Sequence, residues 1–212
     1  NSIADFIAAQ QKSSDGYCVL ALDQITTPTN MGMIIRSAIA SSSFGAILLG
    51  TGSVPANNPL VIKASAGTAL IPASSAASKA HNTVFIQAKD SMYRALTALQ
   101  EDGAEIALLA AEYRDNPKSN AQGEWTDPTA PIHGTRRKHF SDVETSVSLW
   151  DYKPSKKTVF VIGGESAGHD PAVEQVANVR IHIPMAPGVE SLNCAVTASL
   201  VAYSPQLRNS KQ

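Results

Sequence analysis

The sequence predicts an α/β protein built on a mostly parallel sheet with helices on both faces. Continuous apolar runs at residues 17–22, 45–50 and 158–162 are typical of strands that are buried on both faces. Segments with helical spacing separate these runs, and strands that alternate with helices indicate βαβ units with parallel strands. With 212 residues and a 43% apolar composition, the chain can bury one substantial core.

The expected elements alternate along the whole chain. Helical spacing predicts helices over residues 2–12, 31–41, 91–101, 171–177 and 191–203. Apolar runs predict strands over residues 17–22, 45–50, 84–86, 105–110, 158–162 and 179–183. Asn30 is expected to cap the helix that follows it, and Asn58 before Pro59 predicts the start of a further short helix. Residues 111–155 show no clear periodicity, and so long an irregular segment is usually functional or mobile.

Charge and targeting signals narrow the function classes. The formal net charge is -1, whereas nucleic-acid-binding domains are often basic, so any nucleic-acid-binding surface would have to be local. No apolar run approaches the ~20 residues that span a bilayer, and no signal peptide opens the chain. We therefore expect a soluble, intracellular and cytoplasmic protein that does not bind membranes.

The cysteines and the ends of the chain give further expectations. Cys18 and Cys194 have neither the spacing of metal ligands nor that of a disulfide framework, so we expect buried thiols and no metal site. The first residue is Asn1 and not Met, which leaves open a fragment or a trimmed chain. Residues 1–16 would then be a helical stub of an absent N-terminal module. Residues 17–204 would form the main domain, and 205–212 a tail.

Three polar segments each follow a predicted strand, at the edge where open parallel sheets bind ligands. The first contains Asn30 and Arg36, whose guanidinium group suits bidentate binding of phosphate. The second runs from its strand into Gly163 and Gly164, where a ligand can approach the backbone closely. The third, residues 181–193, leads into a helix start with free N–H groups for a polar ligand. Each segment alone is also compatible with a structural role.

A serine hydrolase is a rival interpretation of the second segment. Gly164–Gly168 matches the G-x-S-x-G nucleophile elbow of α/β-hydrolases, with Ser166 as the nucleophile after a strand. In that fold the acid and the histidine follow on further strands. Here His169 is too close in sequence, His182 lies inside a predicted strand, and no H-G-G-G oxyanion loop precedes the serine. The hydrolase is therefore the less favoured alternative.

Together and in order, the segments resemble the three signature motifs of the SpoU/TrmH RNA 2′-O-methyltransferases of the SPOUT superfamily. N-x-G-x-x-x-R over residues 30–36 resembles the first motif, and I-G-G-E-x-x-G over residues 162–168 resembles the second. I-P-M and S-L-N within residues 183–193 resemble the third. Residues 64–67 also resemble an A-S-x-G stretch between the first two motifs. The likeness covers about residues 17–204.

The resemblance implies a Rossmann-like sheet whose C-terminal segment threads a loop to form a deep trefoil knot, an arrangement that is rare among proteins. The loops of the knot would hold S-adenosylmethionine, mainly through backbone groups. Two copies would pack at the knot as a homodimer, with active sites near the interface. The matching cofactor contacts are Gly163, Ile183 and Leu192, followed by Gly164, Met185 and Leu109. The matching catalytic positions are Asn30, Arg36, Glu165, Ser191 and Asn193.

The implied reaction suggests a role for each catalytic position. Methyl transfer to a ribose 2′-hydroxyl requires the alignment of two reactants and the removal of one proton. Arg36 is often assigned as the base in this family, but an arginine with a pKa above about 12 is a poor base. We therefore expect Arg36 to position the phosphate and ribose of the target RNA. Glu165 would orient Arg36 or Asn30, and Ser191 and Asn193 would fix the knot loop.

The segment at about 111–157 departs from the resemblance because it is long for the family. It contains the basic cluster Arg136, Arg137 and Lys138, and we predict that it contacts the RNA. A disordered or dimer-packing loop is the alternative. Two other functions remain open: a knotted RNA-binding protein without catalysis, and methylation of a base nitrogen. The sequence also leaves open whether the substrate is transfer or ribosomal RNA.

Overall fold

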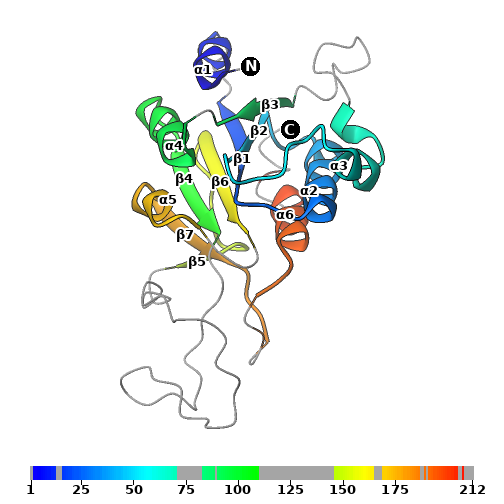
Figure 1. Ribbon diagram of the computed structural model, residues 1–212. Helices are drawn as coiled ribbons and strands as arrows, with labels where there is room; N and C mark the ends of the chain where they lie inside the picture. Colours follow the sequence, from blue (N-terminus) through cyan, green and yellow to red (C-terminus); the bar gives the residue numbers. More distant parts are fainter. Residues whose placement is uncertain are drawn as a thin grey trace.

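A computed structural model describes residues 2–12, 16–70, 83–88, 90–109, 146–164, 169–186, 189, 191–204 and 207. Within them lies a seven-stranded sheet in the order β3-β2-β1-β6-β4-β7-β5. Every neighbouring pair of these strands is parallel. Helices lie on both faces of the sheet (Figure 1). The predicted α/β class and the mostly parallel sheet are confirmed.

Each predicted strand and helix has a counterpart in the structure. The strands are β1 (Tyr17–Asp23), β2 (Ala46–Leu49), β3 (Val84–Gln87), β4 (Glu105–Leu109), β5 (Val147–Ser148), β6 (Lys157–Gly163) and β7 (Val179–His182). The helices are α1 (Ile3–Gln10), α2 (Pro28–Ser41), α3 (Pro59–Ala64), α4 (Met92–Glu101), α5 (Pro171–Gln175) and α6 (Cys194–Ala202). A 3-10 turn, η1, covers Thr68–Leu70. Over the residues described, no helix combines the length and apolar character that crossing a membrane requires.

Two apolar clusters hold the layers together. Alternate residues of a strand point to opposite faces of the sheet. Leu20 and Phe160 therefore belong to the cluster under α2, α3 and α6, and Val19 and Val159 belong to the cluster under α1, α4 and α5. Their strands, β1 and β6, pair in the middle of the sheet. Burial on both faces explains why these strands are continuous apolar runs in the sequence.

Helix α2 begins earlier than the sequence predicted. Its first residue is Pro28 and its N-cap is Thr27, whose side chain makes no capping hydrogen bond. Proline fixes φ near the helical value and lacks only an N–H that would have no partner within the helix, so it favours this start. The prediction that Asn30 caps the helix is therefore wrong, because Asn30 is buried inside the first turn.

Helix α6 begins later than predicted, at Cys194. Asn193 caps it, since the Asn193 side-chain oxygen accepts the backbone N–H of Ala195 at 2.8 Å. Residues 191–193, the end of the third predicted motif, therefore precede the helix, and Asn193 is its capping residue.

Strand β5 lies inside the segment that was expected to be irregular. Its two residues pair with β7 at the edge of the sheet. Leu149 and Tyr152, which follow β5, are buried, and the Tyr152 ring packs edge-on against Phe160 with 5.8 Å between ring centroids. The stretch that leads into β6 is thus part of the core.

Candidate active site

The carboxyl ends of four strands bring predicted site residues to one edge of the sheet. Asp23 ends β1 and lies opposite Gly163 of β6. Leu109 ends β4 and lies opposite Ile181 of β7, and Ile183 follows β7 directly. This edge of an open parallel sheet is where ligands usually bind. The structure therefore gathers residues from three distant sequence segments in the expected place.

Apolar side chains line part of this edge. Leu109 and Ile183 are 7% and 8% exposed, and both belong to the cluster under α2 and α6. Leu192 is half-buried and packs against the same cluster, although it lies in the segment before α6. Met185, in the segment between β7 and α6, is also half-buried. Three of the predicted cofactor contacts thus share one apolar cluster.

A hydrogen bond joins the first and third predicted motifs. Asn193 Nδ2 donates to Asn30 Oδ1 at 3.2 Å, across a sequence separation of 163 residues. The oxygen of the same Asn193 amide caps α6. Because the donor and the acceptor are both in use, the amide is fixed in one orientation between α2 and α6.

Gly32 of the first motif is required by helix packing. A Cβ on Gly32 would lie 2.5 Å from Ala64 Cβ and 2.8 Å from the Ser65 nitrogen, so α2 and α3 meet at this glycine. The chain then turns through Ala66 and Gly67, whose φ angles are 52° and 81°. The A-S-x-G stretch therefore packs against the first motif and supports it.

Gly164 of the second motif is required by a close backbone approach. A Cβ on Gly164 would lie 2.3 Å from the carbonyl oxygen of Gln24, the residue that follows β1. Gln24 itself has a φ of 57°. The glycine was predicted to let a ligand approach, and the structure shows that the protein's own backbone already requires it.

Two buried titratable groups lie at the same edge. Asp23 is 4% exposed, its Oδ2 accepts the Asp170 N–H at 3.0 Å, and burial raises the pKa of its carboxyl group. His169 is 5% exposed, and its Nε2 lies 2.9 Å from the carbonyl oxygen of Leu109. Burial lowers the pKa of the His169 imidazole.

Neither of these two groups was among the predicted site residues. The position of Asp23 directly after an apolar strand is a signal that could have identified it. For His169 the sequence offered only its nearness to the second motif.

Arg36 is exposed on the outer side of α2. It comes six residues after Asn30, so it lies about a third of a turn from Asn30 around the helix and about 9 Å further along its axis. It comes three residues after Met33, which is also exposed and shares its face of α2. The structure therefore does not place Arg36 beside Asn30 within one chain.

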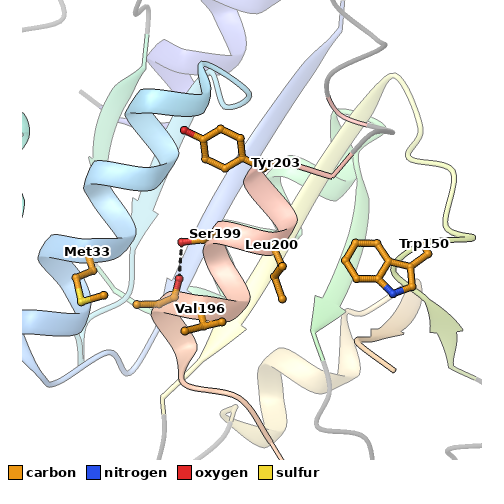
Figure 2. A pocket seen from close by; sticks show the side chains of 7 residues that line it. Met33, Trp150, Val196, Ser199, Leu200 and Tyr203 are labelled. Atoms are coloured by element: carbon orange, nitrogen blue, oxygen red, sulfur yellow. Dashed lines mark hydrogen bonds between the residues drawn. The ribbon is translucent and has the colours of Figure 1, made fainter. Parts of the chain in front are cut away.

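An apolar hollow of about 390 Å³ lies on the outer side of α6 (Figure 2). It is lined by Met33, Trp150, Ala195, Val196, Ser199, Leu200 and Tyr203. Met33, Trp150, Val196 and Tyr203 are each more than 40% exposed. A cluster of exposed apolar side chains is typical of an interaction surface.

Some predicted residues lie outside the described part of the chain. These are Glu165 and Ser166 of the second segment, and Arg136, Arg137 and Lys138 of the basic cluster. Ser191 is described and is exposed in the segment before α6.

Sequence comparison identifies relatives over almost the whole chain. The profile of the SpoU rRNA Methylase family matches residues 17–203. A putative TrmH family tRNA/rRNA methyltransferase of Staphylococcus saprophyticus is 31% identical over 203 residues, which cover 94% of this chain and 64% of the relative. The chain spans about half to two thirds of the length of the curated relatives that it matches.

Solved structures share the fold. The SpoU methyltransferase AviRb of Streptomyces viridochromogenes, in complex with the cofactor AdoMet, superposes with a TM-score of 0.65 at 17% identity, over 94% of this chain and 59% of that chain. A structure described as giving insights into the 2-OH methylation of C/U34 on tRNA superposes with a TM-score of 0.57 at 18% identity. That match covers 94% of this chain and 100% of the other. At these identities the likeness shows the fold alone.

Proposed function

The chain belongs to the SpoU rRNA methylase family, and on that premise we propose that it methylates a ribose 2′-hydroxyl of transfer or ribosomal RNA with S-adenosylmethionine. The observation that supports this most directly is the Asn193–Asn30 hydrogen bond. It joins two of the family motifs at the sheet edge where Leu109 and Ile183 also lie. The family match covers the Gly164–Gly168 segment as well, and this disfavours the serine hydrolase.

The residues at this edge fit the cofactor. Leu109, Ile183 and Leu192 make this edge of the sheet apolar, which would suit the adenine ring of the cofactor. Gly163 has no side chain that would block the end of β6, whereas Gly164 faces the Gln24 carbonyl. A buried imidazole lies nearby. Met185, which follows β7, is half-buried and would contact the ligand from the same edge. When bound, S-adenosylmethionine supplies an electrophilic methyl group on a positively charged sulfur.

The polar residues would align the RNA and assist loss of the hydroxyl proton. The Asn30 and Asn193 amides hold the start of α6 against α2, so that the reacting groups meet in a fixed geometry. The guanidinium group of Arg36 would bind the target phosphate and lower the pKa of the hydroxyl by its charge. Glu165 would orient Arg36 or Asn30, and Ser191 would hold the loop before α6.

The C-terminal segment is proposed to pass through the family's trefoil knot. Three contacts are consistent with this path, since they tie the C-terminal segment to α2 and the residues that follow it. Asn193 bonds to Asn30, the Ser199 and Ser37 hydroxyl oxygens lie 2.8 Å apart, and Ser43 Oγ donates to the Ala202 carbonyl at 2.7 Å.

A homodimer is proposed to form at the hollow beside α6. Its exposed apolar side chains would be buried by a second copy, and Arg36 on the neighbouring face of α2 would then reach the partner's active site. Val196→Glu should yield monomers in sedimentation velocity, because it places a charge in the interface. Leu60→Glu, at an exposed apolar position on α3 outside the hollow, should stay dimeric. A monomeric wild-type protein would contradict the proposal.

RNA binding is proposed to involve the basic cluster Arg136, Arg137 and Lys138, and the enzyme is proposed to act in the cytoplasm. Replacing the three by alanine should weaken RNA binding without changing affinity for the cofactor. This triple variant leaves β5 and Tyr152 intact, whereas removal of all of residues 111–157 would also remove buried core residues. Equal loss of both affinities would contradict an RNA-binding role.

The test of the function has two parts. Calorimetric titration of S-adenosylmethionine and S-adenosylhomocysteine into the protein should show saturable binding at about one site per subunit. Radiolabelled methyl transfer to total transfer and ribosomal RNA should then yield 2′-O-methylated nucleosides after digestion. Methylated bases would favour the base-nitrogen alternative. Cofactor binding without transfer to any RNA would favour the non-catalytic RNA-binding alternative.

A further inference from the structure

His169 lies at the carboxyl edge of the sheet, directly after the second motif. Its Nε2 lies 2.9 Å from the Leu109 carbonyl oxygen, at the end of β4. A carbonyl oxygen can only accept, so Nε2 carries the hydrogen and donates it. In the neutral ring, Nδ1 then carries a lone pair and can only accept.

The acceptor on Nδ1 is buried and unsatisfied. Among the described residues, no group forms a hydrogen bond with His169 Nδ1, and the whole side chain is only 5% exposed. Leaving a buried acceptor without a donor is unfavourable, and most such atoms in folded proteins are paired. The carboxyl groups of Asp23 and Glu174 act electrostatically on the ring, yet burial outweighs them and lowers the pKa of His169. The ring is therefore neutral at neutral pH, and the acceptor is retained.

The ring is held at the predicted cofactor site from two sides. Its Nε2 contacts the residue that ends β4, and the next residue, Asp170, donates its N–H to Asp23 at the end of β1. Between these two strands lies β6, which leads into Gly163 and Gly164. A side chain buried this deeply is out of reach of the surface of an RNA, so a small ligand bound at the strand ends is the partner that suits it.

We propose that His169 is a cofactor-binding residue whose Nδ1 accepts a hydrogen bond from an N–H or O–H group of the bound methyl donor. Its Nε2 meanwhile holds the end of β4 in place. This inference rests on the proposed function, because it concerns the same site. It assigns to this chain a side-chain contact that the family motifs do not contain.

Two substitutions test the roles of the two ring nitrogens separately. His169→Gln places an amide N–H where Nε2 was, so it keeps the bond to Leu109 and loses the acceptor. His169→Asn places an amide oxygen where Nδ1 was, so it keeps the acceptor and cannot reach Leu109. Each variant is compared with the wild type in calorimetric titrations of S-adenosylmethionine and S-adenosylhomocysteine and in thermal unfolding.

Each variant should lose a different property: one should lose affinity for the ligands and the other should lose stability. His169→Gln should unfold at the wild-type temperature but bind both ligands about tenfold more weakly, equivalent to about 1.4 kcal/mol. The loss should be equal for the two ligands, because they share their N–H and O–H groups and differ at the sulfur. His169→Asn should unfold at a lower temperature and keep an affinity within about threefold of the wild type.

Other outcomes overturn the proposal in distinguishable ways. Unchanged affinity in His169→Gln would show that Nδ1 does not contact the ligand. Parallel loss of stability and affinity in both variants would show a structural role alone. If the wild-type protein binds neither ligand, the proposed function fails and this inference fails with it.

Discussion

Polar side chains form different hydrogen-bond patterns at the two ends of the sheet. At the amino end, the Asp102 carboxylate accepts hydrogen bonds from Lys157 Nζ at 2.9 Å, Tyr17 Oη at 3.0 Å and Gln11 Nε2 at 3.0 Å. Lys157 also lies over the Tyr17 ring and donates to the Asp102 carbonyl at 2.7 Å. These polar groups pair with one another and tie the start of β1 and β6 to the segment before β4.

At the carboxyl end, polar groups also connect segments, but one buried acceptor has no hydrogen-bond donor among the described residues. The Asn30–Asn193 bond joins two helices, and Asp23 holds the backbone of Asp170. His169 Nδ1 lacks a hydrogen-bond partner among the described residues. Polar clusters whose members pair with one another stabilise the fold, whereas a buried acceptor without a donor, at the edge where parallel sheets usually bind ligands, is a candidate ligand contact. Substitutions at the two ends should therefore affect different measurements.

The largest effect is expected for Asn193→Asp at the carboxyl end. Aspartate keeps the oxygen that caps α6 but loses the N–H that binds Asn30, so the loss of stability should be limited to about 1 kcal/mol for that one hydrogen bond. Methyl transfer should fall about 100-fold, because the loop before α6 loses its alignment with α2. Transfer rates and thermal unfolding test this. Asn193→Ala, which also loses the cap, should in addition be destabilised by about 1 kcal/mol. Wild-type turnover in Asn193→Asp would show that the Asn193–Asn30 hydrogen bond does not contribute to catalysis.

The next effect is expected for Gly164→Ala, where β6 meets Gln24. The added Cβ would clash with a backbone carbonyl, so the free energy of unfolding should fall by about 2 to 3 kcal/mol. Affinity for S-adenosylmethionine should fall as well, because the strand end must shift. Gly52→Ala is the matched control, since its Cβ would make only ordinary contacts with Gln24, the nearest with the side-chain Cγ at 3.4 Å. Equal stability of the two variants in urea unfolding would refute the close approach.

At the amino end, Asp102→Ala should reduce stability and leave ligand binding intact. Lys157, Tyr17 and Gln11 lose a shared acceptor, which should lower the free energy of unfolding by about 2 kcal/mol. Asp102→Asn keeps one acceptor oxygen and should lose less. Calorimetry on the same proteins should give the wild-type affinity for S-adenosylmethionine. A weaker affinity would mean that the two ends of the sheet are coupled.

The smallest effect is a difference in pH dependence between the wild type and His169→Gln. The pKa of His169 is lowered in the folded state, so the unfolded chain binds more protons below its ordinary value of about 6.5. The wild type should therefore lose stability as the pH falls through this range, and His169→Gln should lose less. Asp23, whose pKa is raised, acts in the opposite direction but is present in both proteins. Parallel urea-unfolding curves from about pH 7.5 to about pH 5 would contradict the assignment.

Much of the fold could be predicted because its signals are local. The strands β1 and β6 are buried on both faces, and this burial leaves continuous apolar runs in the sequence. The Asn58–Pro59 pair marked the start of α3 correctly, since a cap and an N1 proline act within one turn. The same rule applied to Pro28 would have given the start of α2. Strand β5 is only two residues long and exists because β7 pairs with it, so no periodicity revealed it.

The candidate site was predicted in outline and completed by distant contacts. The motifs and the wider family resemblance indicated the residues at the strand ends, and the structure brings Gly163, Leu109 and Ile183 to one edge. The partner of Asn30 could not be foreseen, because it lies 163 positions away in the sequence. Arg36 was expected to reach toward the strand ends, whereas the helix directs it to the outer face.

The sequence by itself determined the α/β class, the run of parallel strands and the segments that bear the site, because these follow from apolar periodicity and short-range backbone preferences. Only the tertiary structure decided that β6 lies between β1 and β4, that Gly32 and Gly164 serve close packing, and that His169 is buried against Leu109. These features depend on which segments meet in space. Such pairings are set by the sum of many weak contacts across the core, and no single stretch of sequence specifies them.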